Sequence, residues 1–171
     1  MDSKGMRIVL MVAAIAAGML AFRVLGFSVL IVLGGLFGAW HLFHKKLGVN
    51  RHLAAALTWA SAHALWFLAG LLLAPLAGIS VVGMMIEVGP DLVILAALVA
   101  WIYVARSRAS LYVLIVYEVA SLAFNAYVLA TDILPLSMQL NLAAHMLLRL
   151  ATVVTAMRAL GRSAEFAKTP A

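Results

Sequence analysis

Four polar side chains recur at helical spacing within the last long apolar segment, residues 136–160. They are Asn141, His145, Arg149 and Thr152, at intervals of four, four and three residues. Because a helix turns once in about 3.6 residues, these intervals place all four on one face. A charged guanidinium at the centre of a membrane helix costs about 2.5–3.5 kcal/mol on insertion scales. The stripe therefore predicts that Arg149 meets polar partners on a neighbouring helix.

The preceding apolar segment, residues 109–130, carries a matching stripe. Glu118, Ser121 and Asn125 follow one another at intervals of three and four residues. A turn at residues 131–135 makes the two helices antiparallel, and Glu118 and Arg149 each lie roughly 13.5 Å from the same end at helical rise. Equal depth predicts an ion pair between Glu118 and Arg149, with Asn125 level with Asn141.

This predicted polar seam has two interpretations. It could hold the two helices together, since polar side chains hydrogen-bond across helices in membranes. It could instead line a path for a solute, an ion or a proton, since an ionisable residue inside a membrane is a functional candidate by default. The residue types alone do not choose between them.

Two histidines fall at similar depth, His145 one turn from Arg149 and His63 in residues 52–73. Either could relay a proton, because histidine titrates near neutrality. A single hydrogen bond in a packed core is the favoured interpretation of each. Their spacing is not that of a haem or metal site and no third ligand matches them in depth, so we predict no metal and no cofactor.

One face of residues 52–73 also carries Trp59 and Trp66 beside His63. These rings could stack on a cationic or aromatic ligand, although aromatic core packing is the favoured interpretation. Glycine-rich phosphate loops, a nucleophile elbow and the HExxH motif are absent from the sequence. No catalytic residue is therefore predicted, and an enzyme is the least favoured class.

The elements that must position these residues follow from composition. Of 171 residues, 67% are hydrophobic and 11% are charged, against about 45–50% and 25% in soluble domains. We therefore expect one membrane-embedded domain in the lipid bilayer, residues 1–171, ending in a short polar tail at 161–171. The net charge of +6 comes from residues between apolar runs, which indicates topology rather than nucleic-acid binding. Without cysteine, thiol chemistry and disulfides are excluded.

Crossing a membrane takes about 20 apolar residues, and the chain offers six such runs. The predicted all-α bundle has spans at residues 6–22, 24–43, 52–73, 90–105, 109–130 and 136–160. The first run is marginal at 17 residues, and it could instead enter partway or lie at the interface. Its basic start resembles a signal peptide, but the second run follows at once, so we expect a retained helix.

The linker at residues 76–89 is apolar but broken by glycines. It could be a re-entrant segment, a surface loop or an extension of the fourth helix. Pro90 suits the first turn of a helix, where Asp91 would complement the positive end of the helix dipole. We therefore expect the fourth helix to begin at Pro90.

Charge predicts the orientation of the bundle. With six spans, ten of the twelve basic residues share one side with both termini. By the positive-inside rule that side is cytoplasmic. Glu87, Asp91 and Asp132 fall on the opposite side, where they would form an acidic outer mouth that attracts cations.

These patterns favour a transport component of a bacterial inner membrane: a channel, a carrier or a membrane-embedded binding subunit for a small solute or ion. The predicted path comprises Glu118, Arg149, His145, Asn141, Asn125 and His63. The alternative is a non-catalytic interaction protein, either an assembly subunit or an exclusion or immunity factor, whose seam is structural. Small residues on the first two helices, Gly34, Gly35 and Gly38 among them, would then dock a partner subunit or a second copy.

Overall fold

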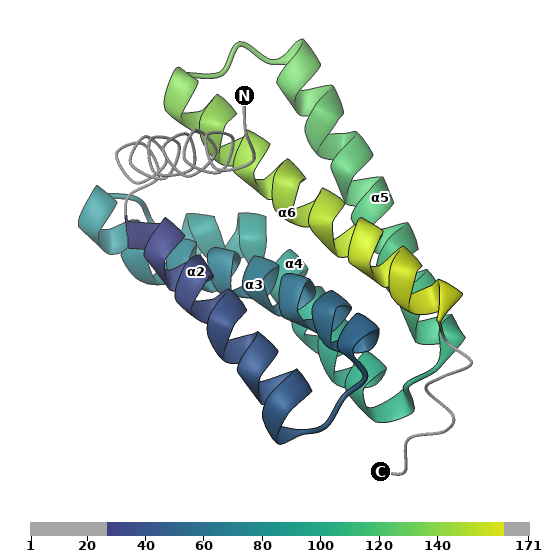
Figure 1. Ribbon diagram of the computed structural model, residues 1–171. Coiled ribbons are helices and arrows are strands. Elements are labelled where there is room, and N and C mark those ends of the chain that lie inside the picture. The colour runs from purple at the N-terminus through teal and green to yellow at the C-terminus, as the bar shows by residue number, and fades with distance from the viewer. Residues whose placement is uncertain (1–26, 163–171) are drawn as a thin grey trace, which may run out of the picture.

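The computed structural model describes residues 27–162, and every regular element in that range is helical (Figure 1). In chain order the elements are α2 (Phe27–Trp40), the π-helical turn η1 (His41–Lys46), α3 (Arg51–Leu73), the 3₁₀ turn η2 (Ala74–Ala77), α4 (Val81–Ala105), α5 (Arg108–Thr131) and α6 (Leu136–Gly161). The predicted all-α class is confirmed for this range. The predicted first span and residues 163–171 of the polar tail lie outside the described residues.

Four helices, α3 to α6, are long and apolar enough to cross a membrane. This length and composition are compatible with a membrane protein. The predicted second span corresponds to α2 and η1, of 14 and 6 residues, which is not among those four helices. The described residues therefore account for four of the six predicted spans, and the six-span count remains a prediction.

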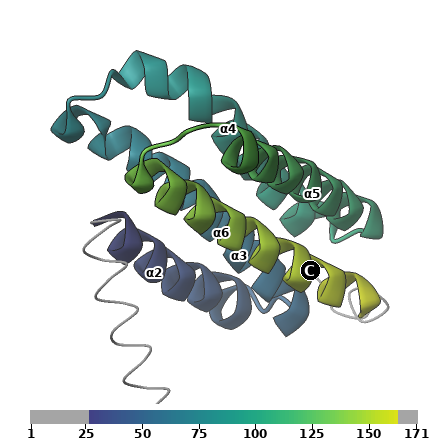
Figure 2. The same cartoon turned by 90° about the horizontal axis from the view of Figure 1, so that it is seen from above.

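Helix α3 is central, because it packs against α2, α4 and α6 (Figures 1 and 2). Its sequence explains this position: alanines fill much of its buried surface and let neighbouring backbones approach closely. The fully buried alanines of α3 are Ala54, Ala56, Ala60 and Ala62. Helix α5 packs mainly on α6, with a smaller contact to α4. The two predicted polar stripes therefore lie on helices that do pack together.

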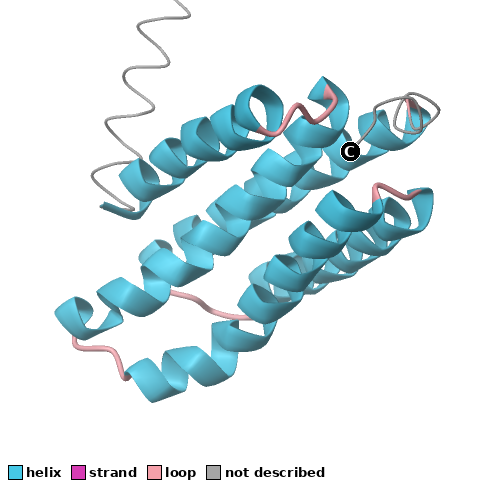
Figure 3. Cartoon of the chain, turned by 90° about the horizontal axis from the view of Figure 1, so that it is seen from below, coloured by secondary structure: helices cyan, strands magenta, loops and turns pink. Residues whose placement is uncertain are grey.

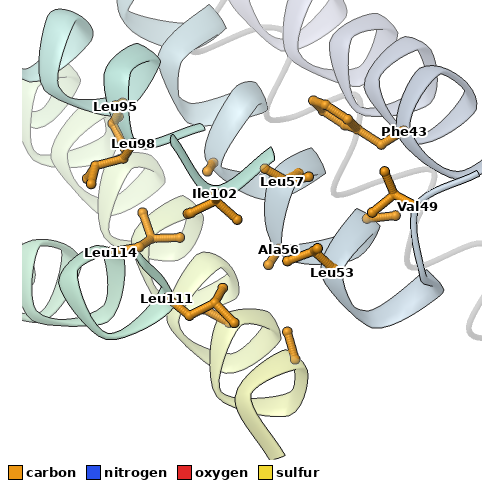
Figure 4. Packing of buried hydrophobic residues seen from close by; sticks show 14 of the residues in the cluster. Phe43, Val49, Leu53, Ala56, Leu57, Leu95, Leu98, Ile102, Leu111 and Leu114 are labelled. Atoms are coloured by element: carbon orange, nitrogen blue, oxygen red, sulfur yellow. The ribbon is translucent and has the colours of Figure 1, made fainter. Parts of the chain in front are cut away.

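An apolar core fills the end of the bundle where α4 and α5 are joined (Figure 4). Leucines from α3, α4 and α5 pack there against one another and against Ile102. Phe43 and Val49 belong to the same cluster, on its side next to α2. Leu53, Leu57, Leu95, Ile102, Leu111 and Leu114 are all 0–1% exposed. The centre of this end of the bundle is therefore apolar and close-packed.

The fourth helix begins earlier than the sequence predicted. Ser80 starts it, because its Oγ accepts a hydrogen bond from Gly83 N–H at 3.3 Å. The supposed linker is thus mostly the first turns of α4, and Pro90 lies inside the helix, which changes direction along its length (Figure 3). An apolar segment gains from helix formation because its backbone groups bond internally, and membrane helices tolerate an interior proline. The expectation of a start at Pro90 was wrong, and the alternative of an extension into the linker is correct.

Candidate functional site

The predicted ion pair between the last two helices is present. Arg149 of α6 donates from Nη1 to Oε2 of Glu118 on α5 at 2.9 Å. Arg149 is 2% exposed and Glu118 is fully buried. Depth matching across the short turn was sufficient to identify the partners, because antiparallel neighbours share one register.

A second carboxylate, that of Asp91, also binds Arg149. Arg149 Nη2 donates to Asp91 Oδ2 at 2.8 Å, and the hydroxyl of Tyr117 donates to Oδ1 of the same carboxylate at 2.5 Å. The sequence predicts Asp91 at the outer mouth, because a helix that starts at Pro90 would have Asp91 in its first turn. With α4 beginning at Val81, Asp91 lies inside the bundle, where it completes a three-residue charge cluster of Asp91, Glu118 and Arg149.

The sequence contained a signal for this position. Asp91 precedes the end of α4 at Ala105 by 14 residues, or about 21 Å at helical rise. Arg149 lies about 13.5 Å from the same end of the bundle, and its long side chain can extend from that depth toward the depth of Asp91. Tyr117 was not predicted, although a signal was present: it precedes Ser121 by four residues and Asn125 by eight, which places it on the same helical face.

The two predicted histidines are joined to the cluster in a row. His63 Nδ1 lies 3.5 Å from Glu118 Oε1, and His63 Nε2 lies 3.2 Å from His145 Nδ1. His63 is fully buried, whereas His145 is partly exposed. Phe67 packs on both imidazoles with ring centroids 4.8 Å apart in each case. Helices α3, α5 and α6 therefore contribute one continuous chain of ionisable side chains.

Aromatic rings flank the arginine. Its guanidinium carbon lies 5.7 Å from the ring centroid of Tyr117 and 6.0 Å from that of Phe67, distances at which a cation and a ring attract. Its Nε has no hydrogen-bond partner among the described residues. The guanidinium is thus held by two carboxylates and flanked by two aromatic rings.

A cavity of about 700 Å³ opens between α4, α5 and α6, with Phe67 of α3 also lining it, and reaches the charge cluster. Arg149, Asp91 and His145 line it, whereas Glu118 and His63 do not. The polar residues along its walls include Glu87, Ser121, Asn125 and Asn141. Its volume falls within the range of about 300–1,000 Å³ that is usual for small-ligand sites.

Of the other predicted site residues, Asn125, Asn141 and Glu87 line the cavity and Asp132 does not. Asn125 and Asn141 face the same cavity from α5 and α6, as equal depth predicted, and Glu87 joins them from α4. Asp132 does not line it. Asp132 is exposed at the end of α5 and accepts a hydrogen bond from Thr131 Oγ1 at 3.2 Å. Of the three predicted mouth residues, Glu87 lines the cavity, Asp91 lies at its inner end and Asp132 lies apart.

The aromatic face of α3 packs inside the bundle. Trp66 is 7% exposed and lies edge-on to His145, with ring centroids 5.7 Å apart. Trp59 packs on a small cluster formed with Val32 and Leu148. Within residues 27–162, no group of three or more His, Cys, Asp or Glu side chains is arranged to hold a metal ion.

Comparisons with protein-family models, with curated proteins and with solved structures gave no match to this chain.

Proposed function

We propose that this chain is a membrane-embedded transport component that binds a small cation or cationic solute in the cavity between α4, α5 and α6. The observation that carries the proposal is the contact of this cavity with Arg149, Asp91 and His145. A seam that served only to join helices would need no access for water. Here polar side chains continue from the cluster along the cavity walls.

The charges that line the cavity favour a cation. Glu87 and Asp91 contribute two negative charges, and Arg149 contributes one positive charge that is already bound to Asp91. Carboxylates around a cleft whose walls are partly apolar raise the local concentration of positive ions. Amide oxygens of Asn125 and Asn141 add neutral acceptors, which suit a partly dehydrated cation.

The apolar core at the opposite end supports a carrier rather than an open channel. The cavity reaches the charge cluster, and the leucines beyond it are fully buried. A solute bound at Asp91 would therefore have access to one side only. Transport would require the helices to rearrange about the site, as in carriers that expose a midplane site alternately.

Topology and location complete the proposal. We further propose that the six apolar runs all span a bacterial inner membrane, with both termini on the cytoplasmic side as the distribution of basic residues predicts. In this orientation the cavity opens away from the cytoplasm, because Leu134, in the turn between α5 and α6, lines it.

Ligand-induced stabilisation tests the proposal. The purified chain in lipid nanodiscs is heated with sodium, potassium, ammonium, choline or tetramethylammonium chloride, and flux of the stabilising ion is then measured in liposomes. A ligand that binds the folded state raises its unfolding temperature. We expect at least one cation to stabilise the protein and to be transported.

A matched pair of variants locates the binding. Asn125→Leu replaces a polar side chain that lines the cavity with an apolar one. Ala126→Leu places a leucine at an exposed position that does not line the cavity. The first should lose the cation effect and the second should keep it. Absence of stabilisation and flux with every cation, or equal effects in both variants, contradicts the proposal.

The second candidate function is a membrane interaction protein, and a separate apolar groove favours it. About 600 Å³ in volume, it lies between α2, α3 and α4 and is lined by Gly35, Gly38 and Ala64 together with larger apolar side chains. A Cβ atom added to Gly38 would meet nothing within 4 Å. Such a small-residue face allows a partner helix to approach closely.

A further inference from the structure

The charge cluster contains one more carboxylate than its arginine can neutralise. Asp91 and Glu118 share the single guanidinium of Arg149. The Asp91 side chain is 33% exposed, so cavity water hydrates part of its charge, whereas the Glu118 side chain is 0% exposed. A net charge without a counterion is strongly unfavourable in such surroundings. One additional positive charge, bound near Glu118, would balance the cluster.

The two histidines connect Glu118 to the cavity. If each carries its hydrogen on Nδ1, His63 donates to Glu118 Oε1 and His145 donates to His63 Nε2, which satisfies both contacts. The remaining ring nitrogen, His145 Nε2, belongs to the only one of these three residues that lines the cavity. Glu118, His63 and His145 thus form an ordered row that ends at a water-accessible space.

We propose that Glu118, His63 and His145 bind one exchangeable proton, which enters and leaves through the cavity at His145. A hydronium ion in the cavity gives a proton to His145 Nε2, the Nδ1 proton of His145 moves to His63 Nε2, and the Nδ1 proton of His63 moves to Glu118 Oε1. The hydronium becomes water, Glu118 becomes a neutral acid, and both histidines end neutral with hydrogen on Nε2. Release follows the same path in reverse.

The ionisable groups around this row come from α4, α5 and α6. Helix α4 supplies Asp91, α5 supplies Tyr117 beside Glu118, and α6 supplies Arg149. Glu87 of α4 lines the same cavity. Helix α2 carries no charged or histidine side chain between Phe27 and Trp40. A proton on the row can therefore balance Glu118 while Arg149 stays bound to Asp91.

Proton binding gives the proposed transport a coupling ion, and in this respect the inference rests on the proposed function. A cation bound beside Asp91 repels a proton held on the row, so each lowers the affinity for the other. Linkage requires this effect to be reciprocal. Loading the cavity with a cation would thus release the proton into it.

The test uses the complete chain in nanodiscs without any candidate solute, so it does not depend on cation binding. Ring nitrogens of all histidines are labelled with ¹⁵N, and their protonation and tautomers are followed by NMR across about pH 5–8. We expect His63 and His145 to change together in one step with exchange of hydrogen between Nδ1 and Nε2. His145→Gln should abolish this change at His63, because the row no longer reaches water.

His41→Gln is the matched control, since His41 is exposed in η1 and lies outside the row. It should leave the shared step intact, whereas Glu118→Gln should remove it because the amide accepts no proton. Independent titration of His63 and His145, fixed tautomers over the whole range, or a shared step that survives in Glu118→Gln each overturns the inference. A shared step in a protein that binds no cation would instead refute only the transport proposal.

Discussion

Arg149 and Asp91, 58 residues apart in the chain, are joined by a 2.8 Å hydrogen-bonded ion pair at the inner end of the cavity. This contact links α6 to α4, two helices whose backbones otherwise meet little, since α4 packs chiefly on α3 and α6 chiefly on α5 and α3. Arg149 also holds Glu118 of α5. The Arg149 side chain therefore links α4, α5 and α6, the three helices that contribute most of the cavity lining.

Replacing this arginine should be strongly destabilising. Arg149→Met leaves two carboxylates without their counterion, and loss of one partner of a buried pair costs about 3–5 kcal/mol. Thermal unfolding and folded yield in detergent measure the effect. Arg158→Met is the control, because Arg158 is exposed at the end of α6. The double variant Arg149→Met with Glu118→Gln should recover part of the loss, and additive losses would contradict a direct pairing.

The sequence predicted the Glu118–Arg149 pair because two antiparallel helices joined by a short turn have a fixed register. Depth alone then identifies the partners. The sequence did not predict the contact of Asp91 with Arg149. Proline favours the first turn of a helix, so Pro90 predicted a helix start, whereas α4 continues through Pro90. In an apolar segment, the hydrogen bonds gained by extending the helix outweigh the one that the proline loses.

Helix rotation was the other quantity that the sequence did not determine. His63 and His145 were expected at similar depth, but their 3.2 Å contact depends on which faces of α3 and α6 meet. Apolar residues occupy both the buried and the exposed faces of these helices; Leu72 and Leu147, for example, are 67% and 68% exposed. Hydrophobic periodicity therefore does not predict which face of each helix is buried in the bundle. Only the spacing of the polar residues indicates that face.

Tyr117 should contribute to stability through its bond to Asp91. Tyr117→Phe keeps the ring beside Arg149 but removes the hydroxyl that donates to Asp91 Oδ1. A hydrogen bond to a charged group is worth about 1.5–3 kcal/mol, so we expect a loss in the free energy of unfolding within that range. Chemical denaturation in mixed micelles measures it. Tyr112→Phe, at a 55% exposed position of the same helix, should change nothing, and equal losses would show that the bond to Asp91 contributes little.

The small-residue groove gives a prediction that separates the two candidate functions. Gly38→Leu fills the groove between α2 and α4, whereas Gly34→Leu adds the same side chain on α2 outside the groove. If a partner helix docks there, Gly38→Leu should lose the partner and Gly34→Leu should retain it. Crosslinking in native membranes followed by mass spectrometry gives the readout.

Folded yield should be similar for both glycine variants, since a Cβ at either position meets nothing within 4 Å. A transport component with no obligatory partner predicts a different result. Cation flux would then be unchanged in both variants, and no crosslinked product would depend on Gly38.

Introduced thiols test whether the cavity is wet, because the natural sequence has no cysteine. Ser121 lines the cavity, and Ala123, two residues away on α5, is exposed but does not line it. A thiol reacts as the thiolate, which forms in water and is suppressed in apolar surroundings. Ser121→Cys should therefore react with a membrane-impermeant methanethiosulfonate added from the side of Asp132, and Ala123→Cys should not.

The reaction rates of a cationic and an anionic reagent at Ser121→Cys compare the electrostatic potential inside the cavity for the two signs of charge. With Glu87 and Asp91 along its walls, a cationic methanethiosulfonate should modify Ser121→Cys on the order of tenfold faster than an anionic one of similar size, because carboxylates concentrate positive ions. Adding Glu87→Gln should reduce this ratio without reducing access. A faster reaction with the anionic reagent would mean that Arg149 dominates the field, and an anion would then replace the cation as the expected solute.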